Sequence, residues 1–103
     1  MIRTEQLTPH TMMFHVQGQF DSQAARELSF SIFHSDHLGF KTFLCNLNRA
    51  LLLDACATDQ LALIGEGLRN KGKTWRVIGP PSSIGNQLIL RTTFPYLFQA
   101  HWN

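Results

Sequence analysis

The sequence predicts an α/β fold, in which a mixed β-sheet of four to five strands carries about three packed helices. Residues 12–17 alternate between apolar and polar side chains, as a half-buried strand does. Phe43–Leu47 and Trp75–Ile78 are short, apolar stretches typical of buried strands. Between them, apolar residues recur at the spacings of an amphipathic helix, namely Ala57, Leu61, Ile64 and Leu68. A strand–helix–strand unit of this kind predicts parallel strands joined by a crossover helix.

The first part of the chain is expected to form a hairpin and then a helix. Residues 2–7 alternate weakly, so they are the expected hairpin partner of the strand at 12–17. Residues 18–21 are interpreted as a turn, after which Asp21 or Ser22 caps a helix at about 23–34.

In the second part, a loop at 34–39 leads into the strand Phe43–Leu47. A second loop is expected to end at Asp54, and the helix that follows runs from about Ala57 to about Asn70. After the strand at 75–78, Gly79-Pro80-Pro81 is a hard break, since proline cannot continue a central strand.

The remaining residues are expected to add a third helix and a last strand. Ser82 or Ser83 is the candidate cap of a helix that runs to about Arg91, and a short strand near Leu97–His101 closes the chain. The expected order is therefore two strands followed by three helix–strand pairs, within one domain spanning residues 1–103.

Composition limits the classes of function. With 44% hydrophobic and 16% charged residues, the chain is expected to be a packed globule. Its net charge of +2 is spread thinly, which argues against nucleic-acid binding. No signal peptide and no apolar stretch of about 20 residues is evident, so the chain is not expected to be embedded in a membrane. Two cysteines imply no disulfide framework, so a reducing cytoplasm is the expected location.

One stretch formally matches a nucleotide-binding pattern. Gly67-Leu68-Arg69-Asn70-Lys71-Gly72-Lys73-Thr74 fits the P-loop consensus G-x-x-x-x-G-K-[ST]. A P-loop requires a strand before it and a helix after it, so that N–H groups and the helix dipole hold phosphate. Here a helix is expected before the match and a strand after it. The stretch is therefore interpreted as a glycine-terminated helix, with Lys73 as a solvated residue.

Other chemical sites find little support. His34 and His37 stand at the end of the first helix, but a stable metal site needs a third ligand that the sequence does not place nearby. His15, on the polar face of its strand, is expected to be solvated. No nucleophile–histidine–acid arrangement and no phosphate cradle is evident, so the expectation is a protein without enzymatic activity, metal or cofactor.

The order of four short motifs resembles the STAS domain of bacterial anti-sigma factor antagonists. Gly18-Gln19-Phe20-Asp21 is similar to the family's Gly-x-Leu-Asp, and Phe43–Leu47 to its Val-Val-Leu-Asp-Leu strand, with Asn46 in place of Asp. Leu53–Ala57 stands where the family has Ile-Asp-Ser-Ser-Gly, and Gly72–Pro81 resembles the later Gly-x-x-Leu-x-Leu-x-Gly.

The resemblance implies a regulatory interaction module that binds a partner through Asp21 and the segment Asp54, Ala55, Cys56, Ala57 and Thr58. In many family members a partner anti-sigma kinase phosphorylates the second Ser of this loop, and the phosphate breaks the complex. Cys56 stands at that position, so the usual Ser switch is absent, and Thr58 is only a weak substitute. Asp54 is expected to cap the helix rather than to perform chemistry.

Several alternatives stay open. The partner implied by the resemblance is an anti-sigma kinase or the ATPase of a lipid-exporting ABC transporter, whose auxiliary subunits share the fold, and a homodimer is not excluded. A different class is a ligand- or redox-sensing domain at the same helix start. For Cys56 the favoured interpretation is a small, half-buried packing residue, and the alternative is a redox thiol at a helix N-terminus.

Overall fold

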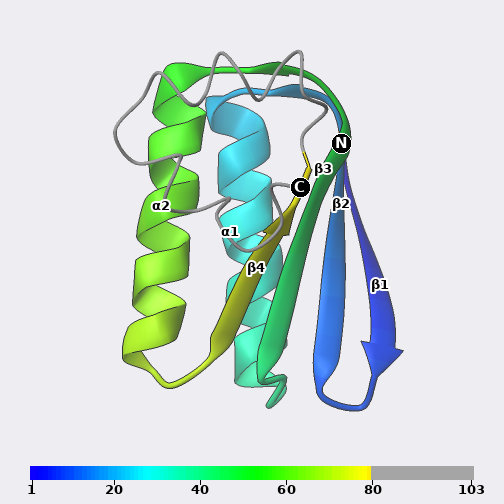
Figure 1. Ribbon diagram of the computed structural model, residues 1–103, viewed down its shortest axis with the longest axis vertical. Helices are drawn as coiled ribbons and strands as arrows, with labels where there is room; N and C mark the ends of the chain where they lie inside the picture. The colour runs from blue at the N-terminus through cyan, green and yellow to red at the C-terminus, as the bar shows by residue number, and fades with distance from the viewer. Residues whose placement is uncertain (80–103) are drawn as a thin grey trace.

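Four strands form one mixed sheet. The computed structural model describes residues 1–79. Strand β1 (Ile2–Thr8) pairs antiparallel with β2 (Thr11–Phe20), and β2 pairs in parallel with β3 (Thr42–Leu53). Strand β4 (Thr74–Ile78) pairs in parallel with the other side of β3. The spatial order is β1-β2-β3-β4, so the predicted hairpin, mixed sheet and adjacent parallel strands are confirmed (Figure 1).

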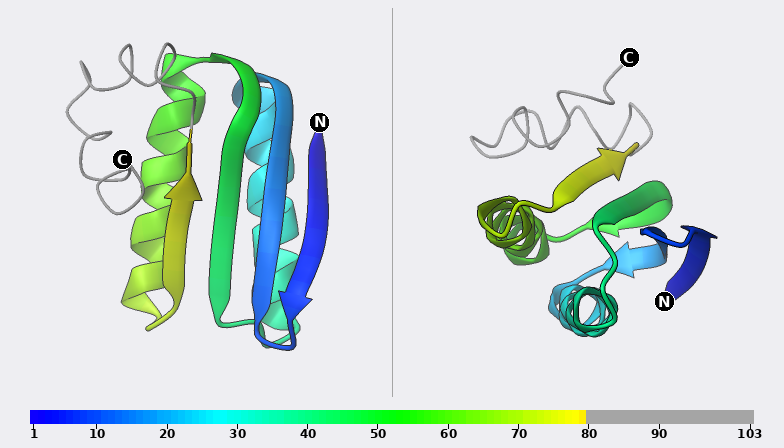
Figure 2. Two further views of the ribbon diagram at one scale, coloured as in Figure 1. Left: turned by 45° about the vertical axis from the view of Figure 1, so that its right-hand side comes forward. Right: turned by 90° about the horizontal axis from the view of Figure 1, so that it is seen from below.

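Two helices connect the parallel strands. Helix α1 (Ser22–His37) lies between β2 and β3 in the chain, and α2 (Ala55–Asn70) lies between β3 and β4. Both helices cover the same face of the sheet, as the view from below shows (Figure 2). The part of the chain that is described thus has two helices; the third helix expected at about 82–91 and the strand expected at 97–101 lie outside it.

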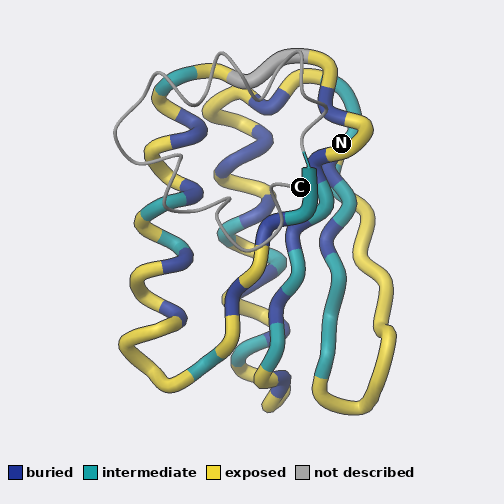
Figure 3. The backbone as a smooth tube through the Cα atoms, viewed as in Figure 1, coloured by how far each residue is buried: buried dark blue, intermediate teal, exposed yellow. Residues whose placement is uncertain are grey.

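The core lies between the helices and the sheet (Figure 3). Alternate strand residues face it, and the rings of Phe14 and Phe43 stack there with centroids 6.4 Å apart. The predicted stripe of α2 is confirmed at Leu61 and Leu68, while Ile64 is only partly buried against the core. Each of the large side chains buried in this layer contributes about 1.5–3 kcal/mol to folding. The fully buried residues of largest volume are Phe14, Phe20, Phe43, Leu28, Leu47, Leu61, Val16, Val77, Thr58 and Cys45.

Two predicted non-regular segments are strands instead. Residues 18–20 belong to β2 and not to a turn, and residues 48–53 belong to β3 and not to a loop. The two segments pair with each other, as Gly18 does with Ala50. The register of the β2–β3 ladder shifts twice in this region. Bulges of this kind accommodate extra residues in one strand without ending the pairing. Neither segment shows the regular alternation of apolar and polar residues by which the central part of β2 was recognised.

The helices are also longer than predicted. Helix α1 runs on to His37, where the N–H of Leu38 donates to the carbonyl oxygen of His34 at 3.1 Å. Helix α2 begins at Ala55 rather than Ala57, because Asp54 caps it. The extension of α1 adds Ser35, Asp36 and His37, whose modest helix propensity tertiary contacts overcome, whereas that of α2 begins with Ala55 directly after its cap.

The face of the sheet opposite the helices carries a polar network. His15 Nε2 lies 2.7 Å from Glu5 Oε1, and the side-chain nitrogen of Asn46 lies 3.2 Å from His15 Nδ1. The side-chain oxygen Oδ1 of Asn46 accepts from the backbone N–H of Asn48 at 2.9 Å, so the side-chain nitrogen is the group that faces the ring. That amide is a donor, so it points its N–H toward His15 Nδ1. His15, only 15% exposed, is thus not the solvated residue that was predicted.

Candidate protein-docking site at the helix N-termini

The two helices begin side by side at one edge of the sheet (Figure 1). The Asp21 side chain caps α1 by accepting from the N–H of Ala24 at 2.9 Å. The N–H of Asp54, which caps α2, donates to the carbonyl oxygen of Phe20 at 3.0 Å. This bond ties the end of β3 to the end of β2, so the sheet brings together the two capping residues that sequence reasoning selected.

Asp54 accepts hydrogen bonds from the first N–H groups of α2. Its Oδ1 accepts from the N–H of Cys56 at 2.8 Å and of Ala57 at 3.3 Å, and its carbonyl oxygen accepts from the N–H of Thr58 at 3.0 Å. The predicted capping role is confirmed. Because the carboxylate already holds these donors, they do not present an open anion site, although helix N-termini favour anions in general.

Exposure separates the candidate residues into two groups. Asp21, Asp54 and Cys56 are exposed and Ala55 is partly exposed, so these four can contact a partner. Ala57 and Thr58 are completely buried against the core and support the loop from below.

Thr58 is poorly placed to accept a phosphoryl group. Its hydroxyl is buried with the rest of the side chain and donates to the carbonyl oxygen of Ala55 at 2.7 Å. A kinase could reach this oxygen only after the first turn of α2 had opened.

The two cysteines have opposite environments. Cys45 lies in the core, and burial raises the pKa of its thiol far above the usual range. Cys56 is exposed, so the interpretation as a half-buried packing residue is wrong. The reason is its place in the first turn of α2, on the side away from the stripe that meets the sheet.

Leu51 is a surface residue at this edge that sequence reasoning missed. It is 76% exposed and stands three residues before Asp54, whereas its neighbour Ala50 is buried. The signal was hidden in the apolar run Leu51-Leu52-Leu53, which was interpreted as loop. Leu51 thus adds an exposed apolar side chain to the strand that leads into the capping residue Asp54.

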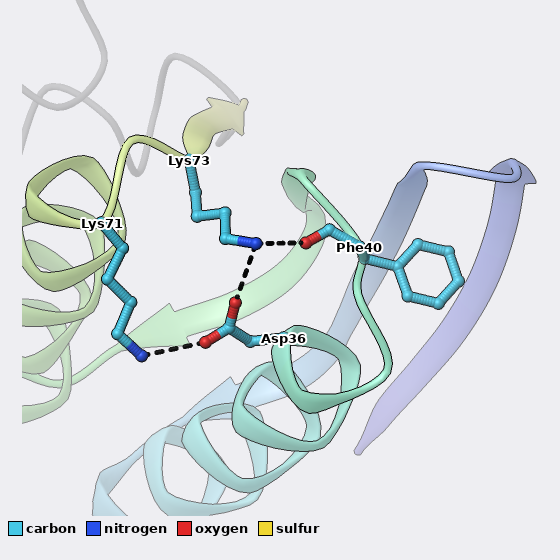
Figure 4. A network of polar contacts seen from close by, with 4 residues as sticks. All are labelled: Asp36, Phe40, Lys71 and Lys73. Atoms are coloured by element: carbon cyan, nitrogen blue, oxygen red, sulfur yellow. Dashed lines mark hydrogen bonds and ion pairs between the residues drawn. The ribbon is translucent and has the colours of Figure 1, made fainter.

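The P-loop match lacks the order of elements that a P-loop requires. Helix α2 precedes the match and β4 follows it, as expected. Lys73, however, is not solvated. Its ammonium lies 3.3 Å from Asp36 Oδ1 and donates to the Phe40 carbonyl oxygen at 3.1 Å, while Lys71 reaches Asp36 Oδ2 at 2.9 Å (Figure 4). The helix end brings both lysines to α1, so these charges join the two crossover units.

This network sets the protonation of Asp36. The hydrogen bond from Lys71 is the largest influence and lowers the pKa of Asp36 below its usual value, and Lys73 acts in the same direction. Partial burial opposes the shift without reversing it. Asp36 is therefore a structural carboxylate that holds the C-terminal ends of the two helices together.

The histidines at the end of α1, His34 and His37, are both on the surface. Within residues 1–79, no group of three or more His, Cys, Asp or Glu side chains is positioned to hold a metal ion.

No helix in this described part is long and apolar enough to cross a membrane.

The arrangement of these elements defines a class: the chain has the STAS fold, as its motifs predicted. It is similar to the anti-sigma factor antagonist SpoIIAA in its unphosphorylated form, with a TM-score of 0.77 and 14% identity over 93% of this chain and 84% of that chain. The phosphorylated form of SpoIIAA, a Bacillus cell fate determinant, gives a TM-score of 0.72 and 15% identity over 93% and 87%.

The fold also occurs as a part of a larger protein. The structure of Mglu matches with a TM-score of 0.68 and 20% identity, over 76% of this chain but only 19% of that chain. No protein-family model and no curated protein matches the sequence.

Proposed function

We propose that this protein is a non-enzymatic regulatory module of the cytoplasm that binds a protein partner through its docking edge, defined as Asp21, Leu51 and Asp54–Thr58. The proposal is supported most directly by exposure: the capping residues Asp21 and Asp54, together with Leu51 and Cys56, are exposed in the segments that lead into the two helices of a STAS fold. The similarity to an anti-sigma factor antagonist suggests an anti-sigma kinase-like protein as the partner.

The docking edge works without the usual phosphorylation switch in this proposal. SpoIIAA exists in unphosphorylated and phosphorylated forms. At the position where the resemblance places the regulatory Ser, this chain exposes Cys56, which is no substrate for a Ser kinase. Thr58, the nearest hydroxyl, is buried. Binding to the partner is therefore constitutive and depends on the amount of each protein rather than on a phosphate.

A redox sensor at the same loop is the second candidate, because Cys56 is exposed. The capping geometry opposes it. The N–H groups that would stabilise a thiolate are occupied by the Asp54 carboxylate, whose oxygen lies 2.8 Å from the Cys56 nitrogen. We therefore favour docking over thiol chemistry.

The test compares charge at the two ends of α2. Cys56→Asp places an unmatched anion in the docking edge, and Asn70→Asp adds the same charge at the exposed far end of the helix. Binding to an anti-sigma kinase and to the ATPase of a lipid-exporting ABC transporter is measured by calorimetry. Cys56→Asp should weaken binding to the true partner by about tenfold or more, while Asn70→Asp should leave the affinity within about threefold.

Phosphorylation is tested with the same kinase and ATP. The wild type should incorporate no phosphate, and Cys56→Ser should gain acceptance. Equal affinity of Cys56→Asp and wild type for every partner would contradict docking at this edge. Stoichiometric phosphorylation of Thr58 would contradict the constitutive mode.

A further inference from the structure

Helix α1 carries two aromatic rings on its outer surface. Phe30 and Phe33 are 77% and 69% exposed, although a phenylalanine in a small globular domain is normally buried. Their spacing of three residues places them next to each other on the helix. They lie outside the stripe that packs on the sheet, which includes Leu28 and Ile32. The rings thus form an apolar ridge on the helical layer.

A groove lies on each side of this ridge. The larger, of about 540 Å³, lies between α1 and α2, and the same two rings line it together with Leu63, Ile64 and Leu68. The smaller, of about 390 Å³, is bounded by the rings, His34 and His37. One surface therefore presents both a projecting apolar element and hollows of matching chemistry.

The exposed apolar area is close to what a dimer requires. With a phenylalanine side chain burying roughly 150–250 Å², the two rings and the 67% exposed Leu63 leave roughly 400 Å² of apolar surface in one patch. A stable interface covers about 800 Å² on each partner, of which about 56–65% is non-polar. The patch supplies most of that apolar share, and the polar rim would complete the interface.

We propose that this face is a homodimer interface, in which the Phe30–Phe33 ridge of one chain packs into the groove between α1 and α2 of a second copy. A two-fold interface uses the same patch on both subunits, so it requires a ridge and a groove on one surface, which is the arrangement found here. Charge favours an identical partner as well. Asp36 and Lys71 line the groove but pair with each other at 2.9 Å, so two copies do not repel across it.

The dimer face is separate from the docking edge. The groove lies along the C-terminal halves of both helices, and the docking edge lies at their N-terminal ends (Figure 1). Dimerisation thus goes beyond the proposed function, and it would present two docking edges in one particle.

The test is sedimentation equilibrium on the full chain over concentrations from micromolar to millimolar. The wild type should show a reversible monomer–dimer equilibrium. Phe30→Glu should raise the dimer dissociation constant by at least about 30-fold, as loss of a central aromatic contact does. Leu51→Glu is the matched control, because this residue is equally exposed at 76% but belongs to the docking edge. It should leave the dimer unchanged and weaken only partner binding.

Each other occupant of the groove gives a contrary result. If residues 80–103 of the same chain cover the patch, the wild type will be monomeric, and Phe30→Glu will lower the melting temperature equally at every protein concentration. If only a different protein binds there, the wild type will be monomeric and Phe30→Glu will have the same melting temperature as the wild type. Either result overturns the proposal, as would dissociation by Leu51→Glu.

Discussion

Two glycines in α2 should respond to the same substitution with opposite signs. A β-carbon added at Gly65 would lie 2.5 Å from Cδ1 and 2.7 Å from Nε1 of Trp75, whereas one added at Gly67 would meet nothing within 4 Å. Trp75 is 8% exposed and sits on β4 beneath the helix, so its indole cannot move freely. Gly65 is therefore required for the close approach of α2 to the sheet, and Gly67 is not.

The magnitudes follow from two opposing terms. Gly→Ala in a helix interior gains up to about 1 kcal/mol in helix propensity at either site. At Gly65 the contact must open by roughly 1 Å, which places the cost in the upper part of the ~1–3 kcal/mol range for overpacking, at about 2–3 kcal/mol. The net effect of Gly65→Ala is a loss of about 1–2 kcal/mol, or roughly 5–15 °C in melting temperature for a domain of this size. Gly67→Ala should gain about 0.5–1 kcal/mol.

The assay is urea denaturation of both variants beside the wild type, at one low protein concentration so that self-association does not contribute. Circular dichroism reports the helices, and tryptophan fluorescence measured in a Trp102→Phe background reports the surroundings of Trp75. A Gly65→Ala variant as stable as the wild type would refute the packing argument. A destabilised Gly67→Ala would show that this helix is constrained by something other than Trp75.

Four further outcomes are expected. Leu61→Asp should cost several kcal/mol in urea denaturation, since it buries an unpaired charge in the core, and an unchanged midpoint would contradict the placement of α2. Lys73→Ala should lower the free energy of unfolding by about 1 kcal/mol at neutral pH. Titration with ATP should show no saturable binding to either the wild type or the variant. Because its ion pairs lower the pKa of Asp36, this carboxylate stabilises the fold above pH ~4, and the stabilisation is lost as the pH falls through the folded-state pKa. Lys73→Ala should therefore make the free energy of unfolding less dependent on pH in the acid range. An identical pH dependence in the variant and the wild type would contradict the pairing. A thiol reagent should modify Cys56 in the native protein but Cys45 only at the rate of unfolding, and rapid loss of both thiols would contradict the burial of Cys45.

The sequence predicted those features that depend on periodicity and local capping. The alternation around Phe14 and the stripe through Leu61 and Leu68 correctly located a strand and a helix on the core. Asp54 was recognised as a cap because its side chain acts on residues two and three positions ahead, within reach of local reasoning. The sheet topology followed from the order of these elements.

What could not be predicted depends on contacts between distant residues. The second half of β3 is a strand because it pairs with residues 18–20, and no local pattern announces that pairing. Lys73 was expected to be solvated because its partner Asp36 stands far away in the sequence. Sequence analysis did not single out Phe30 and Phe33, because their exposure depends on where the helices pack.

The position of β3 has a consequence for how the chain folds. Thr11 pairs with Thr42, and Thr42 pairs with Thr74, so each parallel neighbour lies roughly thirty residues away along the chain. Only the β1–β2 hairpin can form by local contact, whereas each parallel pairing of β3 requires its own crossover to close. We therefore expect the pairing of β3 to limit folding, so that substitutions which weaken it slow folding more than they speed unfolding.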